Sequence, residues 1–228
     1  MITSPHNEKL KLIRKLSERK HRERESLFAT EGEDLVAAGL AAGRDPLFAL
    51  VAPESGIDGE EVEADLLDGV STLGSGTRAI AVWRQAWVEP GPGPCAYLHG
   101  VADPGNVGAI VRTVDALAGG TVTLGPGCAD PHSPKAVRAS MGSIFGVGLA
   151  RASLDETPAP RAALIAHGGV APSGAPATLC LGSERDGLPA DVVAGCDEHW
   201  TIPLRAGGAE SLNVAAAAAI ALHSGLSS

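Results

Sequence analysis

Short apolar segments, each followed by a turn and a helical segment, recur through the second half of this 228-residue chain. The apolar segments span residues 95–101, 121–124, 162–166, 178–181 and 200–204, and helical segments begin after Asn106, Ser133, Leu188 and Ser211. Continuous apolar strands that alternate with helices are typical of parallel sheets covered on both faces. The second half is therefore predicted to be an α/β domain with a mostly parallel sheet.

The first 88 residues alternate between helical and strand-like segments as well. Strands are predicted over 26–30, 47–51 and 79–88, and helices over 35–40 and 60–67, with Gly43 ending the first of these helices. The segment from Glu89 to Pro94 reads E-P-G-P-G-P and is the richest in turn residues. We place a domain boundary there, which predicts one domain over residues 1–88 and a second over 95–228.

Charge is unevenly distributed along the chain. The net charge is −9, yet residues 1–24 hold eight basic and three acidic side chains, a local charge of +5. Leu10, Ile13 and Leu16 recur at helical spacing, which predicts an amphipathic helix with a basic face. Such a helix could contact a polyanion or be an ordinary solvated face, and this feature alone does not decide between the two.

Composition and missing motifs exclude several classes of protein. Apolar runs are too short to span a membrane, and the polar start of the chain is unlike a secretory signal, so a cytoplasmic location is expected. The four cysteines (Cys95, Cys128, Cys180 and Cys196) are widely spaced and are expected to be reduced thiols. There is no P-loop, H-E-x-x-H, C-x-x-C or G-x-S-x-G sequence, and no metal site is predicted.

One polar cluster follows the predicted strand 95–101. Asn106 is a candidate helix N-cap, and Gly108 permits close approach of another group to the backbone. Arg112 lies one helical turn beyond Gly108 and could hold a phosphate through its guanidinium. A capped helix with an Arg paired to a neighbouring acid is the alternative.

Two further clusters follow the predicted strands 178–181 and 200–204. In the first, glycines bracket a serine and Glu184, as a ligand-binding turn requires, although a plain turn would look similar. In the second, Ser211 and Asn213 precede an alanine-rich helix, and Ser211 is a candidate cap for it. The carboxyl ends of parallel strands lie at one edge of a sheet, so the three loops are predicted to converge there. The small side chains of the helix suit a homodimer surface.

These clusters resemble the motifs of a known family, the SpoU-type (TrmH-like) RNA ribose 2'-O-methyltransferases. N-x-G-x-x-x-R from Asn106 to Arg112 is similar to the first motif of the family. L-G-S-E-x-x-G-L from Leu181 to Leu188 is similar to the second, and the segment from Ile202 to Val214, which ends in S-L-N-V, is similar to the third. The basic N-terminal region resembles the L30e-like RNA-binding domain that many members carry.

The resemblance implies a specific fold, cofactor and set of site residues. It implies a trefoil-knotted catalytic domain, S-adenosylmethionine as the cofactor, and a homodimer with the site at the subunit interface. By position, the cofactor contacts would be Leu181, Gly182, Ile202 and Leu212, and the catalytic residues would be Arg112, Asn106, Glu184, Ser211 and Asn213. Arg112 is either the base that removes the 2'-hydroxyl proton or a phosphate clamp, with water or Glu184 as the base.

In this context the basic N-terminal residues become candidate RNA contacts. They are Lys11, Arg14, Arg19 and Arg22. Ribosomal RNA is the expected substrate, because the N-terminal region resembles that of ribosomal RNA members, and transfer RNA is the alternative. Two other functions stay open: a non-catalytic RNA-binding or ribosome-assembly factor on the same fold, and a small-molecule methyltransferase.

Overall fold

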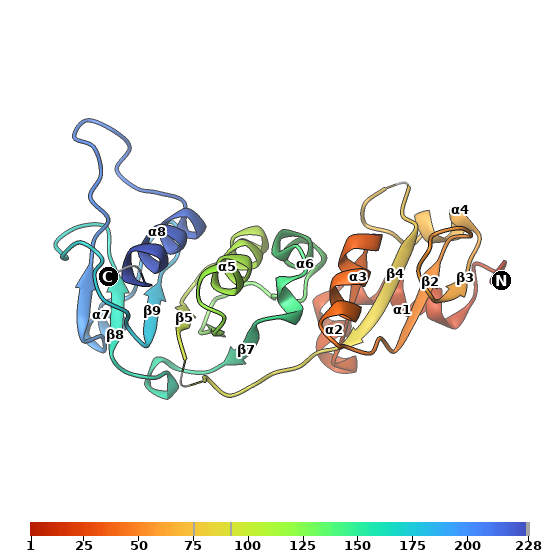
Figure 1. Ribbon diagram of the computed structural model, residues 1–228, viewed down its shortest axis with the longest axis horizontal. Helices are drawn as coiled ribbons and strands as arrows, with labels where there is room; N and C mark the ends of the chain where they lie inside the picture. Colours follow the sequence, from red (N-terminus) through yellow and green to blue (C-terminus); the bar gives the residue numbers. More distant parts are fainter. Residues whose placement is uncertain (75, 92, 227–228) are drawn as a thin grey trace. The chain divides into compact units, whose positions relative to one another are not determined.

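The computed structural model describes residues 1–74, 76–91 and 93–226, and the chain divides into two compact units (Figure 1). Unit 1 comprises Met1–Gln85 and Asp130–Phe145, and unit 2 comprises Ala86–Ala129 and Gly146–Ser228. The segment Asp130–Phe145 thus belongs to unit 1, although in sequence it lies between two strands of unit 2. Within the described residues, every helix is too short or too polar to span a bilayer.

Unit 1 is built on a four-stranded sheet of order β1-β4-β2-β3. Its strands are β1 (Leu27–Glu31), β2 (Phe48–Val51), β3 (Glu60–Glu61) and β4 (Ala79–Arg84). Strand β4 runs antiparallel to β1 and β2, whereas β3 pairs with β2 in parallel. The helices encoded by its first part are α1 (Glu8–Leu16), α2 (Arg19–Glu25), α3 (Glu33–Ala41) and α4 (Ala64–Asp68).

The amphipathic N-terminal segment is confirmed, but its helix is interrupted. Leu10, Ile13 and Leu16 of α1 are buried in the core of unit 1, as their spacing predicts. The chain leaves α1 at Ser17, and α2 follows as a separate helix. The single helix predicted over 60–67 is wrong, because residues 60–61 pair with β2 and only the later part is helical.

The segment Asp130–Phe145 contributes α6 (Pro134–Ser140) and a 3-10 turn, η1 (Ser143–Phe145), to unit 1. Phe145 packs edge-on against Trp83 of β4 at 4.8 Å between ring centroids, and it also contacts the ring of Phe28. Gly39 of α3 faces the same rings, and a Cβ there would lie 2.5 Å from the Trp83 ring. Aromatic contacts and a close helix approach therefore hold this segment in unit 1.

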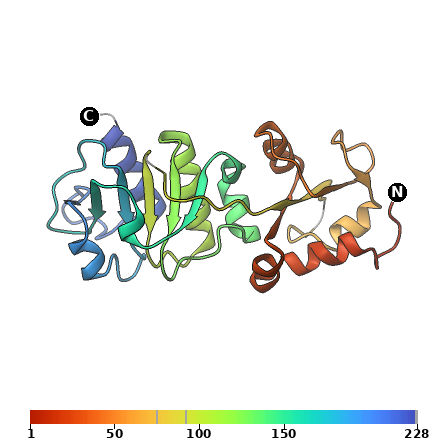
Figure 2. The ribbon, with the colours of Figure 1, turned by 90° about the horizontal axis from the view of Figure 1, so that it is seen from below.

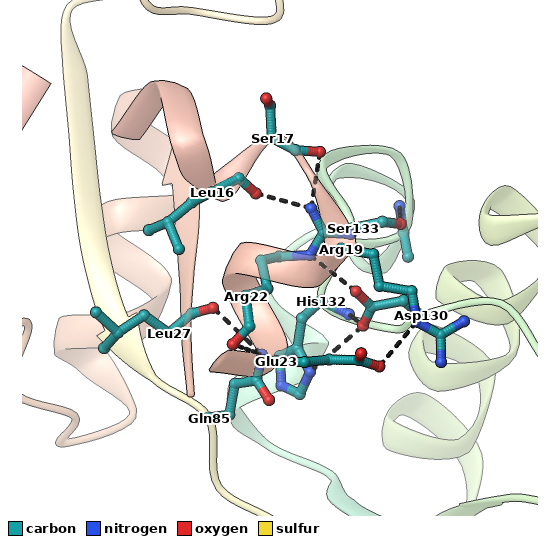
Figure 3. A network of polar contacts seen from close by, with 11 residues as sticks. Leu16, Ser17, Arg19, Arg22, Glu23, Leu27, Gln85, Asp130, His132 and Ser133 are labelled. Atoms are coloured by element: carbon teal, nitrogen blue, oxygen red, sulfur yellow. Dashed lines mark hydrogen bonds and ion pairs between the residues drawn. The ribbon is translucent and has the colours of Figure 1, made fainter. Parts of the chain in front are cut away.

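A buried ion pair adds a polar anchor to the same segment. The Arg22 guanidinium donates to Asp130 at 2.8 Å and to the backbone carbonyls of Leu16 and Ser17 at 2.7 and 2.8 Å (Figure 3). The Arg22 and Asp130 side chains are only 4% and 5% exposed. The Asp130 carboxylate also accepts the backbone N–H of His132. The two buried charges therefore pair with each other and make further hydrogen bonds within unit 1, as buried charges require.

Unit 2 is built on a six-stranded sheet of order β10-β8-β9-β5-β6-β7, in which every pairing is parallel. Its strands are β5 (Cys95–Leu98), β6 (Thr121–Leu124), β7 (Gly148–Arg151), β8 (Arg161–Leu164), β9 (Thr178–Leu181) and β10 (Glu198–Trp200). The parallel α/β prediction is therefore confirmed. The short strand β7 was not predicted. The strand predicted over 79–88 ends at Arg84, and the backbone N–H of Val88 donates to the carbonyl of Leu149 in β7.

Helices cover both faces of this sheet. Helices α5 (Pro104–Leu117) and α8 (Val214–Leu226) lie side by side on one face (Figures 1 and 2). Helix α7 (Ala190–Ala194) lies on the other, where its Val192 packs with Tyr97, Cys180 and Leu154, the last from the 3-10 turn η2 (Leu154–Glu156). From β5 the chain builds outward to β7 and then crosses to β8, β9 and β10, so the strand order reverses between β5 and β9. Open parallel sheets bind ligands beyond the carboxyl ends of their strands at such a reversal.

Candidate functional site

A cavity of about 490 Å³ opens beyond the carboxyl ends of β8, β9 and β10. Its wall is formed by residues 164–167, 181–188, 202, 204, 210–212, 214 and 217. Apolar side chains therefore face a smaller set of polar and charged groups. This size and mixture are typical of a small-molecule site.

The loop after β9 forms one wall of the cavity and closes on itself. The backbone N–H of Ser183 donates to the Gly187 carbonyl at 3.1 Å, and the Gly187 N–H donates back at 3.0 Å. A Cβ on Gly182 would lie 2.2 Å from the Gly187 carbonyl carbon, so only glycine fits there. Gly187 has φ +69°, a conformation that favours glycine. The two glycines that bracket Glu184 are thus required by the shape of the turn.

A chain of hydrogen bonds joins three loops at the edge of the sheet. The Asn106 side-chain amide, on α5, donates to a carboxylate oxygen of Glu184 in the loop after β9. The Asn106 carbonyl oxygen in turn accepts the Asn213 amide at 3.0 Å. Glu184 lines the cavity, Asn106 holds its carboxylate, and Asn213 in turn holds the Asn106 side chain. The three residues are widely separated in sequence, so this contact exists only in the folded chain.

Both helix caps at the site differ from the predicted ones. Asp103, not Asn106, caps α5, because its carboxylate accepts the backbone N–H groups of Gly105 and Asn106. Asn213, not Ser211, caps α8 through bonds from the N–H groups of the second and third helix residues. The Asn106 side chain therefore does not cap the helix and bonds to Glu184 instead.

The structure brings together eight of the nine predicted catalytic and cofactor residues. Leu181, Gly182, Glu184, Ile202, Ser211 and Leu212 line the cavity. Beside it, Asn106 bonds to Glu184, and Asn213 bonds to Asn106. The ninth, Arg112, lies on the exposed side of α5 and is not part of the cavity wall. Within the part of the chain that the structure describes, no side chain pairs with its guanidinium.

The four predicted RNA-binding residues divide into two groups. Lys11, Arg14 and Arg19 are at least partly exposed; Lys11 pairs with Glu8, and Arg19 with Glu23, at the surface. Such exposed pairs exchange readily for a phosphate. The prediction for Arg22 is wrong, because its guanidinium is buried and bonded to Asp130, Leu16 and Ser17 within unit 1 (Figure 3).

The loop after β8 was missed by sequence reasoning. Ile165, Ala166 and His167 line the cavity opposite the loop after β9. The predicted strand 162–166 ends at this point, so its position at a carboxyl edge was an available signal. The residues A-H-G-G that follow Ile165 form no recognisable motif, and the position alone drew no attention. Asp186 and Glu210 also line the cavity, and they were missed because they occupy positions that the second and third motif segments leave variable.

The cavity wall has the chemistry that S-adenosylmethionine needs. Leu181, Ile202 and Leu212 offer apolar surface for a flat base, and the glycine turn exposes backbone groups for polar edges. Carboxylates of Glu184, Asp186 and Glu210 suit the positive charges of a sulfonium and an ammonium group. The residues present therefore fit this cofactor.

Comparison with models of known protein families finds two matches along the chain. The model of the SpoU rRNA Methylase family matches residues 95–223, more than half of the chain. The chain belongs to this family. An MRM3-like substrate binding domain matches residues 7–83, and the resemblance inferred from the motifs is confirmed.

Individual relatives cover almost the whole chain. The chain is 31% identical over 244 residues to the 23S rRNA (guanosine(2553)-2'-O)-methyltransferase RlmP of Bacillus subtilis, with 97% of each chain covered. An AdoMet-bound rRNA methyltransferase from Sinorhizobium meliloti superposes with a TM-score of 0.83 at 28% identity, covering 98% of this chain and 96% of the other. A putative TrmH-family RNA methyltransferase from Porphyromonas gingivalis gives 0.81 at 32% identity, with 98% of each chain covered.

Proposed function

We propose that this SpoU-family chain transfers a methyl group from S-adenosylmethionine to a ribose 2'-hydroxyl of ribosomal RNA. The observation that carries this proposal is the bonded set of Asn106, Glu184 and Asn213 at the mouth of a cavity that fits the cofactor. The full-length similarity to a 23S rRNA 2'-O-methyltransferase supports the choice of RNA.

The bound cofactor supplies a methyl group on a sulfonium, which is already a good leaving group. The chain must therefore orient the 2'-hydroxyl and receive its proton. Glu184 is the group we assign to the proton, because it lines the cavity and its carboxylate is held by Asn106. An arginine guanidinium keeps its positive charge in proteins and has no accessible neutral form, so Arg112 is assigned to the adjoining phosphate. Ser211 and Asn213 position the loop before α8.

The finer parts of the proposal follow from the family and its substrate. The loops around the cavity are proposed to form the trefoil knot of the family, residues 1–88 to act as the RNA-binding domain, and residues 95–228, most of which match the family model, as the catalytic domain. The active form is proposed to be a homodimer. Ribosomal RNA is made and modified in the bacterial cytoplasm, and we place the enzyme there.

Transfer of a labelled methyl group tests the reaction and the substrate together. Ribosomal and transfer RNA are incubated separately with the protein and radiolabelled S-adenosylmethionine, and labelled nucleosides are identified after digestion. Glu184→Gln is expected to lower the rate about 100-fold or more, the ordinary contribution of a positioned base. Glu89→Gln, an exposed carboxylate outside the cavity, is the matched control and is expected to leave the rate unchanged.

Each contrary result removes a different part of the proposal. Cofactor binding without transfer to any RNA would favour a non-catalytic RNA-binding factor. Labelling of transfer RNA alone would make the substrate assignment wrong. Full activity of Glu184→Gln would remove the base assignment.

The position of Arg112 allows a direct test of the homodimer. Arg112 lies outside the cavity wall of its own chain, so we assign it to the cavity of the second copy. Arg112→Ala and Glu184→Gln are each expected to be inactive. Co-refolded in equal amounts, they form mixed dimers that contain one intact site, so about a quarter of the wild-type activity returns. No recovery on mixing would show that Arg112 acts within its own chain.

A further inference from the structure

Two cysteine sulfurs lie next to each other in unit 2. The Sγ atoms of Cys180 and Cys196 are 3.6 Å apart. Cys180 is buried in β9, and Cys196 is partly exposed in the turn between α7 and β10. Cys196 also donates to the Val192 carbonyl at 3.3 Å. The other two cysteines contact oxygen: Cys95 lies 3.2 Å from the Thr123 hydroxyl, and Cys128 donates to the Leu98 carbonyl at 3.2 Å. Among the four cysteines, Cys180 and Cys196 are the pair whose sulfurs are in contact.

The pair encloses the cavity loop in sequence. Cys180 is followed directly by Leu181 and Gly182, which line the cavity, and Cys196 follows the short helix α7 that the same loop enters. Gly182 is packed tightly against the backbone of Gly187, since even a Cβ at residue 182 would lie 2.2 Å from it. A change in the spacing of β9 and the end of α7 therefore acts on both ends of the loop at residues 182–188.

The two thiols differ in reactivity. The hydrogen bond with Cys180 lowers the pKa of Cys196, and the charge of Arg161 lowers it further, whereas burial and the charge of Asp197 raise it. The pKa of Cys180 is raised, first by its contact with Cys196 and then by burial. The thiolate is the nucleophile in sulfur chemistry, so the partly exposed Cys196 reacts first and the buried Cys180 resolves the product.

Only a small movement separates the pair from a disulfide. The Sγ–Sγ distance must shrink from 3.6 Å by about 1.5 Å, because a disulfide bond is about 2.05 Å long. Cys196 lies in a turn after a helix of five residues and is partly exposed, whereas Cys180 is fixed in the middle of the sheet, so Cys196 is the member of the pair that moves. Closure draws this turn toward β9.

We propose that Cys180 and Cys196 are a peroxide-reactive dithiol, and that the disulfide they form weakens cofactor binding in the adjoining cavity. The Cys196 thiolate attacks hydrogen peroxide: an S–O bond forms, the O–O bond breaks, and the departing hydroxide takes up the thiol proton as water. The Cys180 thiol then attacks the sulfenic sulfur: the S–S bond forms, the S–O bond breaks, and a second water leaves. Two thiols lose two electrons, and the peroxide gains them. The effect on the cofactor rests on the function proposed for the cavity.

The test uses the full chain, hydrogen peroxide and S-adenosylmethionine. Peptide mapping without reductant is expected to find a Cys180–Cys196 cross-link, with two of the four thiols consumed and then recovered by dithiothreitol. Calorimetry is expected to show that oxidation raises the Kd for S-adenosylmethionine about fivefold or more, the lower end of ordinary coupling between two sites. Cys196→Ser is expected to abolish both effects. Cys128→Ser, a partly buried thiol with no sulfur partner, is the matched control and keeps both.

The outcomes separate this inference from the proposed function. Absence of the cross-link, or an equal oxidation response in Cys196→Ser, would overturn the dithiol. A cross-link that leaves the Kd unchanged would overturn its coupling to the cavity. If the reduced protein itself binds no S-adenosylmethionine, the proposed function fails, whereas peptide mapping still decides the dithiol.

Discussion

The ion pair between Arg22 and Asp130 is expected to be a principal anchor of unit 1. Removal of one member of a buried pair leaves the other charge without compensation, which ordinarily costs about 3–5 kcal/mol. Both side chains are at most 5% exposed, so solvent cannot take over as partner. Arg22→Met also removes the donor to the carbonyls of Leu16 and Ser17. We therefore expect Arg22→Met to lower the free energy of unfolding of unit 1 by about 4 kcal/mol.

A second substitution separates the charge effect from packing. In Arg22→Met/Asp130→Leu no uncompensated charge remains, and an apolar pair of similar volume is often neutral or better. The double variant still lacks the hydrogen bonds to the two carbonyls, at about 1 kcal/mol each. We expect it to be more stable than Arg22→Met alone. Arg19→Met, which breaks the exposed Arg19–Glu23 pair, is the matched control and is expected to cost less than about 0.5 kcal/mol.

Hydrogen exchange read by mass spectrometry checks this prediction unit by unit. Opening free energies are compared for β1, for the segment Asp130–Phe145 and for β6 of unit 2. Arg22→Met is expected to lower protection in the first two regions together, because both belong to unit 1. A destabilisation below about 1 kcal/mol, or a double variant less stable than the single one, would refute the reasoning.

Three further predictions concern other parts of the chain. Burial raises the pKa of Tyr97, the single tyrosine, to about 12. Absorbance at 295 nm is therefore expected to titrate near 12 in the folded protein and near 10 in urea, and the free energy of unfolding is expected to fall as the pH rises through this window. A midpoint near 10 in the folded protein would contradict this prediction. Gly182→Ala is expected to raise the Kd for S-adenosylmethionine, measured by calorimetry, more than about tenfold, because its Cβ would collide with the Gly187 backbone. Gly93→Ala, where a Cβ meets nothing within 4 Å, is expected to leave the Kd unchanged, and equal Kd values for the two variants would contradict the prediction. Lys11→Ala and Arg14→Ala are each expected to flatten the salt dependence of ribosomal RNA binding, by about 0.9 in the logarithmic slope for each phosphate that the side chain neutralises, and an unchanged slope would remove that residue from the interface.

The elements of unit 2 were largely predictable because its strands are buried on both faces. A strand of this kind is apolar throughout, so 121–124 and 178–181 were predicted with the observed bounds. Strand β7 was missed since Gly148 and Arg151 interrupt its apolar character. The order of the strands in the sheet is set by packing between segments that are distant in sequence. The hydrophobic pattern of a single sequence therefore does not predict this order.

The candidate site was predictable to the level of loops but not of contacts. Parallel strands place their carboxyl ends at one edge, which was enough to bring Asn106, Glu184 and Asn213 together. Which amide caps a helix and which reaches the carboxylate depends on distances of a few ångströms, so both caps were assigned wrongly. Arg22 shows the same limit: its partner Asp130 is 108 residues away, and a basic face seen in sequence carries no sign of that pairing.

Unit 1 is made of two chain segments, and this limits the experiments that can test its role. Removal of residues 1–88 would be the simple way to ask whether the remaining chain methylates a small molecule. The same cut takes away Phe28 and Trp83, against which Phe145 packs, and Arg22, which pairs with Asp130. The segment Asp130–Phe145, which in sequence lies between β6 and β7, would then expose apolar surface and an uncompensated charge. Loss of activity after this truncation would therefore not distinguish an RNA substrate from a small one, whereas the surface variants Lys11→Ala and Arg14→Ala are expected to change RNA binding and leave the core of unit 1 intact.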